Sequence, residues 1–155
     1  MPSYRKDDAP LDYAQISADL GNADYYAGVY SQDPNYYTKA VAAYGAAVEV
    51  YAGETDRTLW AQYQGELGNA LLMLGGAADG DNATLQKAVA AYEAALTVVT
   101  RENDADGWAR NQSNLANALT TLGFGGSFAV SGRRVERNRS FGGAGLVDRA
   151  ALVAG

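Results

Sequence analysis

The amino-acid sequence predicts an all-α solenoid built from antiparallel helix hairpins, and two internal repeats are the main reason. Residues 60–71, which open with Trp-Ala, return 48 positions later as residues 108–119, and a weaker copy begins at Tyr13. The alanine-rich residues 40–44 also return 48 positions later, as residues 88–92. Self-similarity at a fixed period of this size is typical of repeat proteins, in which each unit buries its apolar face against its neighbours.

Proline, glycine and aspartate residues mark the ends of the first two expected helices. The first spans residues 11–27, because Pro10 suits a helix start and Gly28 suits a helix stop. The second spans residues 34–51, with Asp33 as the N-cap in front of a proline at the first helical position.

Three further helices are expected over residues 58–74, 82–100 and 107–122. The first of these three stops at the glycine pair that begins with Gly75, and the last stops at Gly123. Asp81 takes the N-cap place that Asp33 holds one repeat earlier. The chain therefore alternates between helices led by tryptophan or tyrosine, called A helices, and alanine-rich B helices, in the order A-B-A-B-A.

Small residues on both kinds of helix predict close packing. Alanines at helical spacing on the B helices let two axes approach closely, while Tyr44 and Tyr92 act as large knobs between them. On the A helices a leucine expected in the core is followed by a tiny residue. These pairs are Leu20-Gly21, Leu67-Gly68 and Leu115-Ala116. Glycine costs roughly 1 kcal/mol in a helix interior, so a packing reason is expected for it.

These residues resemble the tetratricopeptide repeat (TPR) family. The resemblance rests on Leu67-Gly68 in an A helix and on Ala88, Tyr92 and Ala95 in the following B helix, and it covers roughly residues 11–123. The common repeat of that family has about 34 residues. The longer period here is similar to extended bacterial variants with a Trp-Ala-x-x-Gln start and a Leu-Gly-Asn-Ala core. The resemblance implies a helical interaction scaffold.

One face of every expected A helix is polar. Its residues lie at spacing i, i+4, i+7, which places each set of three on one side of its helix. The three sets are Gln15, Asp19 and Asn22; Gln62, Glu66 and Asn69; and Arg110, Asn114 and Asn117. In TPR proteins the equivalent face lines a concave groove that grips peptides, so the resemblance implies a partner-binding role for these residues. The alternative is a face that is merely solvated, although asparagine is a poor helix former to repeat three times on such a face.

Tyrosine is concentrated at the start of the chain, with ten of the eleven tyrosines within residues 1–63. Tyrosine is enriched at interfaces, so a self-assembly surface is one interpretation. Its residues would be Tyr25, Tyr26, Tyr36 and Tyr37, together with Phe124 and Phe128 near the other end. The other interpretation is that these rings seal the open end of the solenoid. Asp24 supports the end-cap interpretation, because later repeats have leucine at its position.

Composition excludes several classes of site. The chain has no Cys and no His, which removes thiol nucleophiles, imidazole bases and thiolate or imidazole metal ligands. Residues 102–107 look like the front of an EF-hand loop, but Ser113 occupies the position of the bidentate glutamate. No set of residues assembles a nucleophile, a base and an oxyanion site. We therefore expect a non-enzymatic protein without a metal or another cofactor.

Charge divides the chain into two expected parts. Residues 1–123, the repeat domain, carry seven basic and 16 acidic side chains, whereas residues 124–155, a glycine- and arginine-rich tail, carry five and two. An acidic body repels nucleic acid, so a nucleic-acid partner is disfavoured. The tail is expected to be extended, disordered or ordered by assembly. The polar first ten residues and the lack of a long apolar run predict a cytoplasmic protein without a membrane span.

Two functions are compatible with this pattern. The first is a protein-interaction scaffold that binds a partner peptide or helix on the concave A-helix face. The second is a structural protein whose repeats stack head to tail into rings or filaments, as a homo-oligomer, depending on whether the rotation between copies closes.

Overall fold

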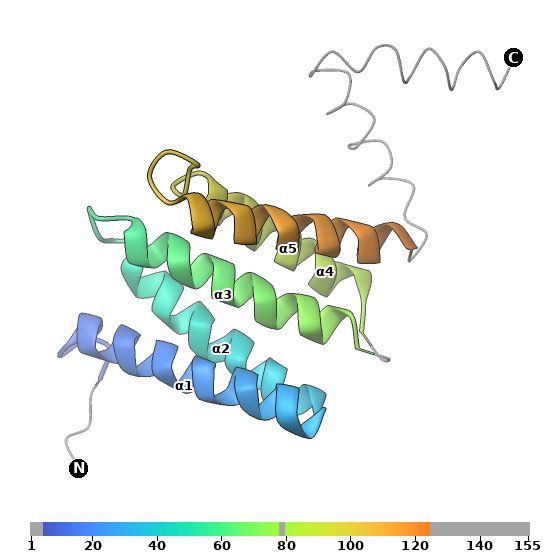
Figure 1. Ribbon diagram of the computed structural model, residues 1–155. Coiled ribbons are helices and arrows are strands. Elements are labelled where there is room, and N and C mark those ends of the chain that lie inside the picture. The colour runs from blue at the N-terminus through green and yellow to red at the C-terminus, as the bar shows by residue number, and fades with distance from the viewer. Residues whose placement is uncertain (1–4, 78–79, 125–155) are drawn as a thin grey trace, which may run out of the picture.

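The computed structural model describes residues 5–77 and 80–124, and all of its regular structure is helical. The five helices are α1 (Pro10–Ser31), α2 (Pro34–Tyr51), α3 (Thr58–Gly75), α4 (Asn82–Leu96) and α5 (Ala105–Phe124). Each helix packs against the next one along the chain, and α3 also touches α5. Figure 1 shows the resulting order in space, from α1 at the bottom to α5 at the top. The all-α fold class predicted from the sequence is confirmed.

The N-terminal ends of the two B helices follow the sequence prediction. Asp33 caps α2 by accepting a 3.0 Å hydrogen bond from the backbone N–H of Asn35. Asp81 caps α4 in the same way, with a 2.7 Å bond from the N–H of Thr84. Each carboxylate satisfies a donor that the first helical turn leaves without an intrahelical partner. The repeated aspartates therefore fix where both B helices begin.

The core of each hairpin is a tyrosine ring laid on a glycine. Tyr44 and Tyr92 are the two largest side chains that are almost completely buried, with exposed fractions of 1% and 0%. A Cβ atom on Gly21 would come within 2.8 Å of the Tyr44 ring, and one on Gly68 within 2.7 Å of the Tyr92 ring. The glycines after Leu20 and Leu67 thus make room for an aromatic ring of the B helix.

The end of α1 differs from the prediction. Gly28 does not stop the helix, which continues to Ser31 and ends with Gln32 in the left-handed conformation at φ 57°. Gly28 is instead buried under the ring of Tyr37, whose Cε1 atom would lie 2.8 Å from an added Cβ. Its small size serves packing, in the same manner as at Gly21.

The boundaries of two other helices also differ from the prediction. The fourth helix ends at Leu96 rather than at residue 100, because Thr97 and two valines follow and the Thr97 hydroxyl bonds the carbonyl of Ala94 over 2.6 Å. The fifth helix begins at Ala105, two residues before the expected start, and it passes Gly123 to end at Phe124. The predicted tail of residues 124–155 lies outside the described residues apart from its first residue.

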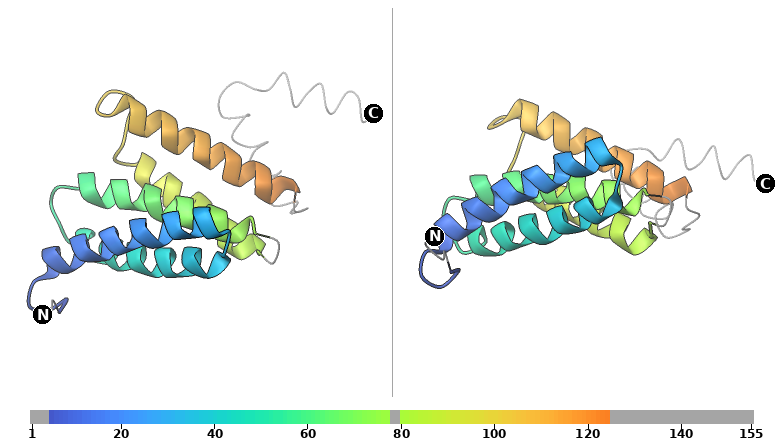
Figure 2. Two further views of the ribbon diagram at one scale, coloured as in Figure 1. Left: turned by 60° about the horizontal axis from the view of Figure 1, so that its bottom comes forward. Right: turned by 90° about the horizontal axis from the view of Figure 1, so that it is seen from below.

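The prediction that Leu20 belongs to the core is wrong. Its side chain is 56% exposed, whereas Leu115, at the equivalent position of α5, is only 6% exposed. The reason is the position of α1 at the end of the stack: α2 covers α3 and α4 covers α5, but no described helix precedes α1. Figure 2 shows α1 and α2 side by side on this outer face when the molecule is seen from below.

Candidate functional site

Two of the three asparagines that recur at the last position of the polar faces, Asn22 and Asn69, are bonded to the buried tyrosines. The Tyr44 hydroxyl donates to Oδ1 of Asn22 over 2.8 Å, and the Tyr92 hydroxyl donates to Oδ1 of Asn69 over 2.8 Å. A buried hydroxyl without an acceptor is costly, so each asparagine stabilises the hairpin to which it belongs. This pairing accounts for the recurrence of asparagine in the first two repeats.

Asn69 also joins α3 to α5. Its Oδ1 accepts a second hydrogen bond, from Nδ2 of Asn114 over 2.8 Å, and its own Nδ2 donates to Glu66 over 3.1 Å. An amide oxygen has two lone pairs, so the oxygen of Asn69 is fully used inside the protein. The structure therefore brings Glu66, Asn69 and Asn114 together in one hydrogen-bonded group.

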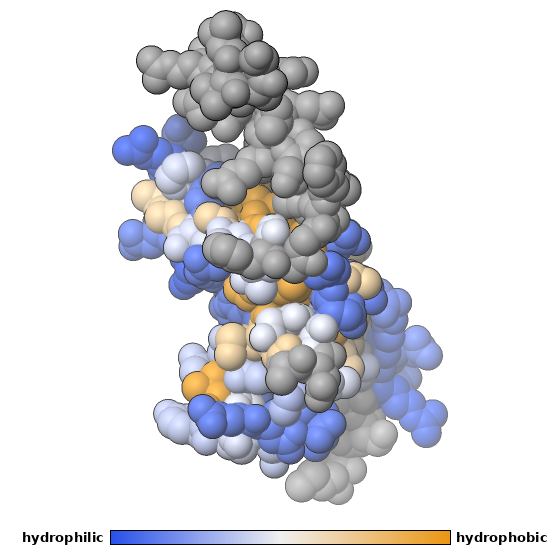
Figure 3. Space-filling view, turned by 90° about the vertical axis from the view of Figure 1, so that its right-hand side faces the viewer, coloured by the Kyte–Doolittle hydropathy of each residue, from blue (hydrophilic) through white to orange (hydrophobic). Residues whose placement is uncertain are grey.

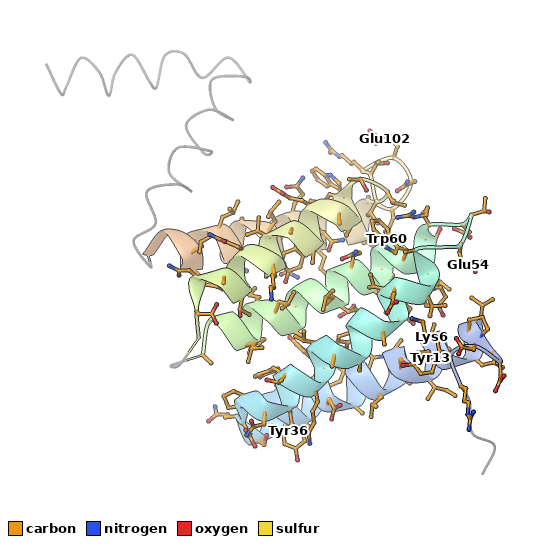
Figure 4. All side chains as sticks on the ribbon, turned by 180° about the vertical axis from the view of Figure 1, so that it is seen from behind. Lys6, Tyr13, Tyr36, Glu54, Trp60 and Glu102 are labelled. Carbon is orange, nitrogen blue, oxygen red and sulfur yellow. The ribbon has the colours of Figure 1, made fainter. Side chains whose placement is uncertain are left out.

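A cavity of about 240 Å³ opens beside this group, between α3, the start of α5 and the segment that connects α4 to α5. Four residues predicted from the polar faces line it, namely Gln62, Glu66, Asn69 and Arg110. In Figure 4, Trp60 of α3 and Glu102 of the connecting segment lie at this end of the molecule. The cavity thus joins the polar faces of the second and third A helices.

The connecting segment is held in shape by its own side chains. Asn103 donates to the carbonyl of Val98 over 2.8 Å and accepts from the N–H of Thr100 over 2.8 Å. Asp104 accepts from the N–H of Gly107 over 2.9 Å and so caps α5. Apart from Thr100, these residues all line the cavity, whose rim is therefore fixed by hydrogen bonds.

The cavity contains a buried amide that the sequence analysis missed. Asn111 is only 6% exposed and lines the cavity, and no hydrogen bond from another described residue reaches its side chain. Its Oδ1 occupies space over Gly65, where it would lie 2.8 Å from an added Cβ. The preceding A helix has Tyr63 at the equivalent position, 48 residues earlier, and Tyr63 is buried in the core. A polar residue at a core position of the repeat was the available signal.

The lining carries charges of both signs. Glu66 and Asp104 contribute carboxylates and Arg110 contributes a guanidinium group. The pKa of the Tyr44 hydroxyl is raised, first by burial and second by the negative charge of Glu66, so this carboxylate also acts on the first hairpin. Among the described residues, no three acidic side chains gather as a metal site would need. The cavity suits a ligand with both donor and acceptor groups.

The remaining predicted residues lie elsewhere. Gln15 and Asp19 are exposed on α1 and bonded to each other over 3.1 Å. Asn117 is exposed and lines a separate groove of about 500 Å³, together with Met73, at the end of the molecule where α1, α3 and α5 terminate. Figure 3 faces this end and shows apolar side chains along its middle, between polar margins.

The aromatic residues considered for self-assembly are divided between core and surface. Tyr37 is buried, and Tyr25 is half-buried with its ring edge-on to those of Tyr26 and Tyr37. Tyr26 is 59% exposed, whereas Tyr36 is partly covered by Lys39, whose Nζ lies 4.9 Å from the ring centroid. The side chain of Phe124 and all of Phe128 lie outside the described residues.

None of the helices in the described part of the chain combines the length and the apolar character that a membrane span requires. Comparisons of the chain with protein-family models, with curated proteins and with solved structures found no match.

Proposed function

We propose that this chain is a non-catalytic interaction scaffold, a TPR-like solenoid that binds a segment of a partner protein on the polar face of its A helices. The observation that carries the proposal is the buried amide of Asn111 in the cavity between α3 and α5. A peptide group offers one N–H and one C=O, and an asparagine amide can bond both. Extended peptide backbone is therefore the ligand that this amide fits.

The size and charge of the cavity support the same ligand. Its volume of about 240 Å³ lies below the range of about 300–1,000 Å³ that is typical of small-molecule pockets. A short stretch of peptide fits this volume better than a large cofactor does. Glu66 and Arg110 on its walls offer an acceptor and a donor for polar side chains next to the bound backbone.

The residues proposed to contact a partner differ in part from those that the sequence predicted. The amide oxygen of Asn69 is occupied by Tyr92 and Asn114, so this residue supports the site more than it contacts a ligand. The contacts to a partner would come from Gln62, Arg110 and Asn111. The outer asparagines lie outside this site, because Asn22 accepts the Tyr44 hydroxyl and Asn117 lines the separate groove with Met73.

A peptide-display selection against the immobilised chain tests the proposal. Selected peptides are titrated against the unchanged protein and against Asn111→Leu, which keeps a similar volume but removes both hydrogen-bonding groups. We expect Asn111→Leu to weaken binding at least about tenfold, since a desolvated hydrogen-bonded contact at an interface is worth about 1.5 kcal/mol or more. Its thermal stability should change little, by less than about 1 kcal/mol, because the substitution removes no hydrogen bond to another described residue.

Asn117→Leu is the matched control, because it makes the same change on the same helix outside the cavity. It should bind the selected peptides as the unchanged protein does. Equal binding by Asn111→Leu, or equal weakening by both variants, would contradict the proposal.

A further inference from the structure

A second surface lies at the opposite, outer face of the first hairpin. A groove of about 670 Å³ runs between α1 and α2, and its α1 side is lined by Tyr13, Ile16, Leu20 and Asp24. Ile16 is 47% exposed and Leu20 is 56% exposed. Large aliphatic side chains exposed next to one another along a helix mark an interaction site more often than single ones do.

The same groove exists inside the molecule, where its A-helix side is covered, although Ala90 on the B-helix side stays exposed, as Ala42 does. A shift of 47 residues along α1 turns Ile16 into Tyr63 and Leu20 into Leu67. On the B-helix side, a shift of 48 residues leaves every residue type unchanged: Lys39, Ala42, Ala43 and Ala46 become Lys87, Ala90, Ala91 and Ala94. The groove between α3 and α4 is therefore the internal counterpart of the exposed one.

The helix α2 covers the α3 side of this internal groove with three side chains. Val41 packs against both core clusters, including the one that contains Leu71 and Ala91. Val48 packs against the first cluster, and Tyr51 stacks on Tyr63 with ring centroids 5.6 Å apart. The covering ridge thus uses positions i, i+7 and i+10 of one helix. As a result Tyr63 is only 5% exposed, whereas its counterpart Ile16 stays open.

One residue of the exposed groove departs from the internal copy, and it carries charge. Asp24 stands where Leu71 is buried, 6% exposed, in the cluster that Val41 contacts. Among the described residues Asp24 has no ion pair, and the amine of Lys39 lies over the Tyr36 ring instead. The helix α1 carries three aspartates and no basic residue. A covering helix would therefore meet a negative charge where α2 meets leucine.

We propose that the groove between α1 and α2 docks one amphipathic helix of a partner protein, placed as α2 is placed on α3. The partner helix carries Lys or Arg at the position of Val41, facing Asp24. It carries an aliphatic residue at the position of Val48 and an aliphatic or aromatic residue at that of Tyr51, which would lie on Ile16. This surface shares no residue with the cavity that contains Asn111, so each proposal can be tested without the other.

Synthetic peptides that copy α2 probe the groove. The peptide of residues 33–53 and its Val41→Lys and Val41→Glu versions are labelled and titrated with the full chain by fluorescence anisotropy. An exposed ion pair contributes up to about 1 kcal/mol, or about fivefold in affinity. The Lys peptide should therefore bind about threefold more tightly than the native peptide, and the Glu peptide should bind more weakly than both.

Two protein variants locate the binding. Asp24→Leu recreates the internal groove, so the preference should reverse and the native peptide should bind more tightly than the Lys peptide. Ile16→Asp should weaken all three peptides at least about tenfold, because it places a charge under the apolar ridge. Asp106→Leu and Met73→Asp make the matched changes on other surfaces, at residues that are also exposed, and should leave every affinity unchanged. Melting curves by circular dichroism confirm that each variant is folded.

Several results would overturn the assignment. These are the absence of saturable binding, an unchanged peptide preference in Asp24→Leu, and unchanged affinities in Ile16→Asp. Dimerisation of the chain that Ile16→Asp abolishes would also overturn it, because a second copy would then occupy the groove.

Discussion

The hydroxyl of Tyr92 in α4 donates a 2.8 Å hydrogen bond to Oδ1 of Asn69 in α3. Tyr44 and Asn22 form the same bond at the same distance one repeat earlier. Each tyrosine ring packs on the glycine that directly precedes the asparagine to which its hydroxyl is bonded. Two adjacent residues of the A helix therefore determine both the position of the ring and the hydrogen bond of its hydroxyl. This three-residue arrangement holds each hairpin closed.

Removing the hydroxyl tests the bond. Tyr44→Phe and Tyr92→Phe should each lower the free energy of unfolding by about 1 kcal/mol, the usual net value of one hydrogen bond. Asn69→Ala should cost more, about 2 kcal/mol, because two donors lose their acceptor and the Tyr92 hydroxyl stays buried without a partner. Asn117→Ala, at an exposed site without such a bond, is the control and should change stability by less than about 0.5 kcal/mol. Urea denaturation measures all four, and equal losses for Asn69→Ala and Asn117→Ala would refute this role for Asn69.

The two glycines should resist even the smallest enlargement. Gly21→Ala and Gly68→Ala place a Cβ atom 2.7–2.8 Å from a ring that is at most 1% exposed. We expect losses of about 1–3 kcal/mol from overpacking, despite the better helix propensity of alanine. Gly45→Ala is the matched control in α2, where an added Cβ meets nothing within 4 Å, and it should stabilise the protein by up to about 1 kcal/mol. Thermal melts in which Gly45→Ala lowers the melting temperature as much as Gly21→Ala and Gly68→Ala do would contradict the packing argument.

Alkaline pH should unfold the protein through the same tyrosines. Burial raises the pKa of the Tyr44 and Tyr92 hydroxyls above the value of about 10 that tyrosine has in an unfolded chain. The unfolded state therefore loses these protons first, and stability that is fully present below pH 10 falls as the pH rises above it, by about 1.4 kcal/mol per pH unit for each tyrosine. Denaturation series at pH 8 to 11 measure the slope. The Tyr44→Phe, Tyr92→Phe double variant should show a shallower slope, and an unchanged slope would assign the effect to other groups.

The mass of the protein in solution distinguishes docking of partners from stacking of copies. A scaffold that docks partners by its A-helix face and its outer groove should remain a monomer of 16.3 kDa over a hundredfold concentration range. Light scattering after size exclusion measures this directly. A mass that grows with concentration would instead support head-to-tail stacking of copies.

Helix positions followed from the sequence because the signals for them are local. Asp33 and Asp81 cap the helices that their repeat positions predict, and the tyrosines of the B helices fill the hairpins. A predicted helix end was wrong where a glycine is needed for contact with another helix. Gly28 lies inside α1 and accommodates the ring of Tyr37 from α2. Local patterns cannot tell a glycine that ends a helix from one that admits a neighbouring side chain.

The candidate site was only partly predictable for a similar reason. The polar faces identified Gln62, Glu66 and Arg110, because spacing along one helix determines which residues share a face. The internal use of Asn69 depends on a tyrosine 23 residues later, and a single helix pattern does not contain that contact. Asn111 would have been found by comparing repeats, since it replaces the buried Tyr63.

The central claim is that the Asn111 amide binds peptide backbone, and its side-chain NH₂ signals in a ¹⁵N–¹H NMR spectrum test this most directly. On addition of a display-selected peptide, we predict that these two signals shift strongly and become protected from solvent exchange, together with the backbone signals of Gly65 and Arg110. The signals of Asn117, outside the cavity, should stay in place. Saturating binding that leaves the Asn111 side-chain signals unmoved would contradict the account.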